Sequence, residues 1–169
     1  VLKVTFDNAI VSIGALVNST ASGDANATAL VAVALLDKRL ITNLAYPRDF
    51  SASGPLGVGA FKTAKKLTCL VGTTVTKPGS GSSGSPEPIF VASDRVGEIW
   101  GFNSASAASV QKAVNLGGHP TSVLTSVALS PCGNFLASCD RNEKIRIAVC
   151  PMQKFSTLSV CGKPAIRVF

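Results

Sequence analysis

The sequence predicts an all-β protein built from many short strands, and two observations support this. Short runs rich in Val, Ile, Leu, Phe and Ala alternate with clusters of Gly, Pro, Asp, Asn and Ser, and convincing long helical patterns are absent. This punctuation is typical of β-sandwiches and β-propellers. Hydrophobic residues make up 46% of the 169 residues and charged residues 15%, which excludes a wholly disordered or fibrous chain and allows one domain with a core.

The segment between residues 118 and 160 carries the clearest strand pattern. The tetrapeptide Pro-Cys-Gly-Asn at residues 131–134 predicts a turn, because Pro fixes φ and Gly and Asn accept positive φ. Residues 144–149 begin by alternating polar and apolar side chains, as a half-buried strand does. The segment therefore predicts strands at residues 126–130, 135–139, 144–149 and 156–160, with turns at 131–134 and 140–143.

The same pattern recurs along the chain. Gly118-His119 opens this segment, and Gly162-Lys163 stands where the next Gly-His is expected, at a spacing of about 44 residues that matches the roughly 40–45-residue period of a WD repeat. Upstream, Asp94-Arg95 corresponds to Asp140-Arg141, and a weaker copy spans residues 29–44. We therefore expect about three blades of a larger WD-repeat β-propeller, in units at residues 1–48, 60–116 and 117–161, with the next blade beginning at 162.

Between two of the expected strands lies a segment rich in Gly, Ser and Pro. It covers residues 77–88, and its composition cannot hold it in a core. We expect a flexible surface insertion there.

Several classes of protein and site are disfavoured by what the sequence lacks. Its longest apolar run, at residues 29–36, is far shorter than the roughly 20 residues that a membrane helix needs. The five cysteines form no C-x-x-C pair, so no metal site and no disulfide framework is expected. Phosphate-binding and dinucleotide-binding glycine motifs are also absent, and we expect no cofactor.

The run from Asp140 to Arg146, preceded by Ser130-Pro131, resembles the non-catalytic WD-repeat subunit of the eukaryotic tRNA (guanine-N7)-methyltransferase. Residues 91–100 are similar to the preceding blade of that family, and the resemblance is strongest from about residue 90 to 151. The chain departs from the family at Asn142, where Asp is usual, and at Lys163, which replaces a His. Weaker similarity covers residues 37–41 and 65–68.

This resemblance implies a seven-bladed propeller that is a scaffold and not an enzyme. The partner would be the catalytic methyltransferase subunit, in a heterodimer, and that subunit would carry the S-adenosylmethionine site. The pair would form N7-methylguanosine in tRNA, which the propeller would contact indirectly or weakly. The implied location is the nucleus, with the cytoplasm as a second location.

Basic residues are the candidate partner contacts. The net charge of +7 is consistent with an anionic partner. The resemblance implies that Arg146 pairs with acidic residues of the methyltransferase, and a guanidinium can grip a carboxylate with two hydrogen bonds. The alternative for these side chains is a solvated strand face or loop end. The expected contacts are Arg146, Lys144, Arg141, Lys66 and Lys65.

A second set of residues is expected to hold the blades together. His119 is the sole histidine and should hydrogen-bond within its blade, while Asp94 and Asp140 should organise turns. Asn142 is expected to belong to the same structural blade motif. Trp100 is expected to pack between blades. One alternative is a hydrolase in which His119 joins Asp140 and a serine as a nucleophilic triad. Another is a general WD scaffold of a ubiquitin-ligase or signalling complex.

Overall fold

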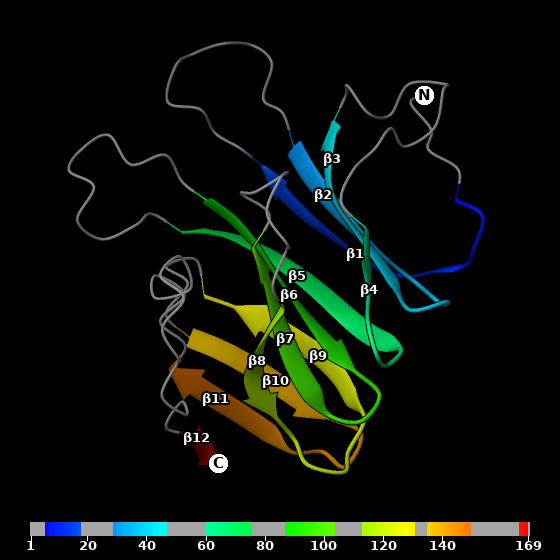
Figure 1. Cartoon of the computed structure of the whole chain (residues 1–169). Helices are drawn as coiled ribbons and strands as arrows, with labels where there is room; N and C mark the ends of the chain where they lie inside the picture. The colour runs from blue at the N-terminus through cyan, green and yellow to red at the C-terminus, as the bar shows by residue number, and fades with distance from the viewer. Residues whose placement is uncertain are drawn as a thin grey trace, which may run out of the picture.

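The computed structural model is all-β, as the sequence predicts. Its strands form three four-stranded antiparallel sheets (Figure 1). Among the residues that it describes, no helix is long and apolar enough to cross a membrane. The structure describes residues 6–17, 29–46, 60–75, 87–103, 113–130, 135–149 and 166–168.

Each sheet is a meander, in which every strand pairs with the next one along the chain. The first sheet contains β1 (Ile10–Val17), β2 (Ala29–Leu35), β3 (Arg39–Tyr46) and β4 (Ala60–Lys62). The second contains β5 (Leu67–Val75), β6 (Glu87–Asp94), β7 (Glu98–Asn103) and β8 (Ala113–Gly118). The third contains β9 (Leu124–Leu129), β10 (Phe135–Asp140), β11 (Ile145–Val149) and β12 (Ile166–Val168).

Three boundaries differ from those that the sequence predicts. β4 pairs with β3, so residues 60–62 complete the first sheet, although the pattern placed them at the start of the second unit. Residues 87–88, expected in the flexible insertion, form the beginning of β6 opposite β5. β12 pairs with β11 and so belongs to the third sheet, although the sequence placed residues 166–168 in the next blade, beginning at 162. A strand three residues long shows no alternation, which explains why β4 and β12 escaped prediction.

Several expectations fall outside the described residues. These are the turn at residues 131–134, the strand at 156–160, residues 77–86 of the insertion and the glycine-lysine pair at 162–163.

The second sheet is covered on both faces, because it lies between the other two. Along β6, Phe90 and Ala92 pack toward the first sheet, while Ile89 and Val91 pack toward the third. All four side chains are buried. Because successive strand residues point to opposite faces, a run of consecutive apolar residues is what a strand buried on both sides requires.

The first strands of the three sheets lie side by side. β1 contacts β5, and β5 contacts β9 (Figure 1). Glycines make the first of these contacts close, since a Cβ atom added at Gly72 would lie 2.8 Å from Cγ of Leu16. The three sheets thus follow one another through contacts between their first strands. The propeller remains a prediction.

Candidate functional site

The turns between the second and third strands of the three sheets lie at one end of the molecule (Figure 1). Each turn ends with a residue of positive φ, at Lys38 (72°), Gly97 (92°) and Glu143 (63°). The N–H of each donates to the carbonyl three residues earlier, at 3.2–3.4 Å. The three sheets therefore share one turn conformation, and it fixes where the neighbouring side chains lie.

Aspartates hold two of these turns. Oδ1 of Asp94 accepts the backbone N–H groups of Val96 and Glu98, both at 2.9 Å. Oδ1 of Asp140 accepts those of Asn142 and Lys144, at 2.9 and 3.1 Å. In the first sheet Leu35 stands at the corresponding position, and its side chain is buried.

His119 connects the third sheet to the second. Its Nδ1 lies 3.0 Å from Oδ2 of Asp140, and its Nε2 lies 2.9 Å from Oγ of Ser138. Its backbone N–H donates to the carbonyl of Gly97, in the turn of the preceding sheet, at 2.8 Å. The ring is 1% exposed. One side chain therefore ties a connection, a strand and a turn together.

Asp140 stays ionised in this buried place because its partners outweigh the burial. Desolvation raises its pKa, but hydrogen bonds from His119, from the backbone of Lys144 and Asn142 and from Ser122 lower it to about 2. The side-chain amide of Asn142 also donates to Oγ of Ser122, at 3.1 Å. The turn of the third sheet is thus held by one charged, fully hydrogen-bonded group.

Ser138, His119 and Asp140 lie in the order of a nucleophilic triad, but all three side chains are buried. Sequence reasoning missed Ser138 and Ser122, although a serine two residues before Asp140 was a usable signal. Ser138 is 6% exposed, and its hydroxyl lies against the buried ring of His119 at 2.9 Å. The arrangement suits a structural link between the β8–β9 connection and the β10–β11 turn.

Arg146 points inward rather than to solvent. Its Nη1 donates to the carbonyl of Gly118 at 2.7 Å, and its Nε is buried without a hydrogen-bond partner among the described residues. It follows Asp140 at the same spacing at which Trp100 follows Asp94 in the second sheet. Arg146 therefore occupies a packing position, with part of its donor capacity unused.

The other expected basic contacts lie at the turn end. Arg141 and Lys144 flank the turn of the third sheet and are exposed, as is Lys65, while Lys66 is half-buried. The N–H of Arg95 donates to the carbonyl of Lys66 at 3.0 Å, which brings the turn of one strand pair against the β4–β5 connection.

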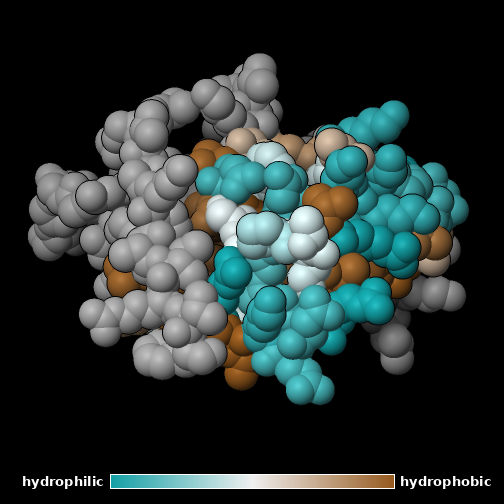
Figure 2. Space-filling view, turned by 90° about the horizontal axis from the view of Figure 1, so that it is seen from below, coloured by the Kyte–Doolittle hydropathy of each residue, from teal (hydrophilic) through white to brown (hydrophobic). Residues whose placement is uncertain are grey.

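We call this end the basic turn face. Seen from below, the described surface is largely hydrophilic with hydrophobic patches (Figure 2). Acidic residues at this end include Asp37, Glu98 and Glu143. Arg39 is paired with Asp7 and Asp37. The face is defined by Lys38, Arg39, Lys62, Lys65, Lys66, Arg95, Arg141 and Lys144.

The outer side of the third sheet is apolar and open. Ile145 is 56% exposed and Ile147 43% exposed, and Phe135 and Val149 extend the same face through their pairing. The sequence placed Lys144 and Arg146 on the strand face opposite these isoleucines. The alternation holds, but the isoleucines face solvent and the arginine faces the interior.

Comparisons with known proteins add no identification. No protein-family model and no curated protein matches this chain. Within the described segments, no group of three or more His, Cys, Asp or Glu side chains could hold a metal ion. The function is therefore inferred from the geometry above and from the resemblance of the Asp140–Arg146 run.

Proposed function

We propose that this chain is part of a WD-repeat β-propeller that acts as a non-catalytic binding scaffold, with the basic turn face as its docking surface for an acidic partner. The observation that carries the proposal is the gathering of basic side chains from all three sheets at one end. Lys38, Arg95 and Arg141 stand on short turns that share one conformation. Lys62, Lys65 and Lys66 lie on β4 and the β4–β5 connection. Rigid turns reduce the entropy lost when side chains are fixed by a partner.

The propeller part of the proposal draws on the packing of the sheets. Consecutive meanders that meet through their first strands are the pattern of neighbouring blades. The open apolar face of the third sheet, around Ile145 and Ile147, is suited to a further sheet of the same kind. In the described chain, apolar faces of just this composition are buried between sheets.

The specific partner that we propose is the catalytic subunit of a tRNA (guanine-N7)-methyltransferase, in a heterodimer located in the nucleus. The resemblance of the Asp140–Arg146 run supports it. Within that run, Arg141 and Lys144 are exposed, while Arg146 donates to a backbone carbonyl. We therefore assign the partner contact first to Arg141 and Lys144, then to Lys65 and Lys66. tRNA would be bound indirectly or weakly.

The test is co-purification followed by charge reversal. The full-length protein is expected to bring down a methyltransferase subunit, identified by mass spectrometry. The double variant Arg141→Glu/Lys144→Glu should weaken that binding at least about tenfold, since each reversal replaces attraction by repulsion. Glu143→Lys, in the same exposed turn, is the matched control and should keep or tighten binding.

Other results of this test would favour a WD scaffold in another complex or reject the docking surface. Recovery of other partners, still sensitive to the charge reversal, would support a WD scaffold in another complex and reject the methyltransferase assignment. Binding that ignores the double reversal would remove the basic turn face from the proposal.

A further inference from the structure

The second sheet lacks the histidine that the third sheet has. The N–H of His119 donates to the carbonyl of Gly97, and the N–H of Thr63 donates in the same way to Lys38, both at 2.8 Å. Each of these residues follows the last strand of one sheet, β4 or β8, and leads into the next sheet. Thr63 is therefore the counterpart of His119, and Asp94 is the counterpart of Asp140.

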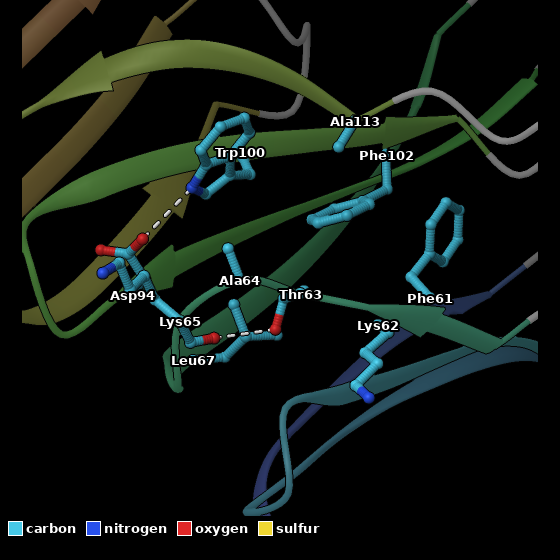
Figure 3. Close-up of a pocket in the computed structure, with 10 residues that line it drawn as sticks. All are labelled: Phe61, Lys62, Thr63, Ala64, Lys65, Leu67, Asp94, Trp100, Phe102 and Ala113. Atoms are coloured by element: carbon cyan, nitrogen blue, oxygen red, sulfur yellow. Dashed lines mark hydrogen bonds between the residues drawn. The ribbon is translucent and has the colours of Figure 1, made fainter.

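A pocket lies beside Thr63 and Asp94, the counterparts of His119 and Asp140. Its volume is about 230 Å³, and its lining includes Thr63, Asp94, Trp100 and Phe102 (Figure 3). The hydroxyl of Thr63 lies 2.9 Å from the carbonyl of Lys38 and so turns to the backbone. In the close-up, Asp94 is connected to the indole of Trp100, while Thr63 is connected to the backbone of Lys65.

The carboxylate of Asp94 has an under-used oxygen on the pocket side. Oδ1 accepts two backbone N–H groups, but Oδ2 accepts one bond, from Nε1 of Trp100, at a long 3.3 Å. The equivalent oxygen of Asp140 lies 3.0 Å from the imidazole of His119. Asp94 is 1% exposed. A buried carboxylate oxygen gains from each further donor, because it has lost its water.

The aromatic and aliphatic part of the lining favours a flat ring. Phe61 and Phe102 meet edge to face with ring centroids 5.0 Å apart, and Leu67 is also part of the lining. Ala92 stands at the position that Ser138 occupies in the third sheet, so the hydroxyl that meets the second ring nitrogen there is missing here. Recognition must then depend on a single N–H donated to Asp94.

We propose that this pocket binds an imidazole ring, which takes the place that His119 fills in the third sheet and donates an N–H to Oδ2 of Asp94. This goes beyond the scaffold function and does not depend on it. The imidazole could come from a histidine side chain of a bound polypeptide or from a free imidazole compound, since both offer the same ring.

The first test compares two ligands of one shape. 4-Methylimidazole carries the N–H, whereas 4-methylthiazole lacks it. Trp100 is the single tryptophan of the chain, so its fluorescence and its indole N–H signal in NMR report on this site alone. We expect saturable changes with 4-methylimidazole and about tenfold weaker binding of 4-methylthiazole, the loss of one hydrogen bond. Equal binding of both ligands, or binding of neither, would overturn the proposal.

The second test fills the pocket from within. Thr63→His should place a ring against Asp94, raise the melting temperature and abolish the response to 4-methylimidazole. Ser126→His, at an exposed position of β9, is the control and should leave the response intact. A Thr63→His protein that still binds 4-methylimidazole would place the ligand elsewhere.

The source of the ring is decided with N-acetyl-histidine-methylamide. Binding of this compound at the affinity of 4-methylimidazole indicates a polypeptide histidine, whereas binding of 4-methylimidazole alone indicates a free compound.

Discussion

At the scale of single residues, His119 does most to join the parts of the described structure. It connects Asp140 and Ser138 of the third sheet with the backbone of Gly97 in the second. Because the ring is buried, each of its nitrogens needs a partner, and each has one. Removing the ring would take a hydrogen-bond partner from two buried groups of β10, Oγ of Ser138 and Oδ2 of Asp140.

His119→Ala should therefore lower the free energy of unfolding by about 1–3 kcal/mol, the cost of leaving a buried hydrogen-bonding group unsatisfied. Urea denaturation followed by circular dichroism measures it. Asn142→Ala, at an exposed position of the same turn, is the comparison and should cost less. If His119→Ala kept its stability and instead abolished a hydrolytic activity, the structural role assigned to His119 would be wrong.

Acid should weaken the same link, and the sign follows from Asp140. Its pKa is lowered to about 2 in the folded protein, against roughly 3.9 in an unfolded chain. The group therefore adds stability that is complete above about pH 4 and disappears as the pH falls toward about 2. The unfolding free energies of the wild type and Asp140→Asn should converge over this range. A gap that stayed constant from about pH 5 to pH 2 would show that the carboxylate charge is not what stabilises the turn.

At the scale of elements, the shared turn conformation is the main finding. Gly97 and Gly117 both have positive φ, at 92° and 104°. Their surroundings differ, because a Cβ atom at Gly97 would lie 1.9 Å from the carbonyl oxygen of His119, while nothing lies within 4 Å of one at Gly117. Gly97 is required by the close approach of the β8–β9 connection as well as by its positive φ, whereas Gly117 is required by backbone conformation alone.

Gly97→Ala should consequently destabilise the protein far more than Gly117→Ala. Strain at positive φ costs both variants about 1–2 kcal/mol, and the clash with His119 is added only in the first. Thermal unfolding of the two variants side by side measures the difference. Equal losses would mean that the β8–β9 connection can move away from the turn without cost.

Strands with a clear pattern were the predictable ones. β10 and β11 lie within one residue of their predicted bounds. The pattern of side chains marks each strand, and a polar turn marks the boundary between them. β4 and β12 were not predictable, since three residues carry no period and edge pairing is a tertiary effect. For the site, the turn-end position of Arg141 and Lys144 followed from the pattern. The inward course of Arg146 did not, because it depends on a carbonyl in another strand.

At the scale of the whole molecule, the open face of the third sheet stands out. Phe135, Ile145, Ile147 and Val149 are each between 43% and 56% exposed and lie on one side of β10 and β11. An apolar sheet face of this kind favours association with another apolar surface. Within this chain, similar faces are covered by the neighbouring sheet.

The variant Ile145→Thr/Ile147→Thr should reduce self-association of the 169-residue chain, because Thr keeps the strand preference and removes apolar surface. Stability should change by less than about 0.5 kcal/mol per site, as at other exposed positions. Light scattering across a concentration series and urea denaturation give the two readouts. A large loss of stability would instead indicate that this face is packed in the folded chain.

The hydrogen bonds from Thr63 to Lys38 and from His119 to Gly97 also bear on the order in which the sheets open locally. In both, a turn carbonyl of one sheet anchors the first residues that lead into the next sheet. Loosening of an early turn would therefore release the amide of its successor, while loosening of a later sheet leaves the earlier turn closed on itself. Local opening should accordingly spread from the N-terminal sheet toward the C-terminal one more readily than in reverse, an asymmetry that amide hydrogen exchange can register.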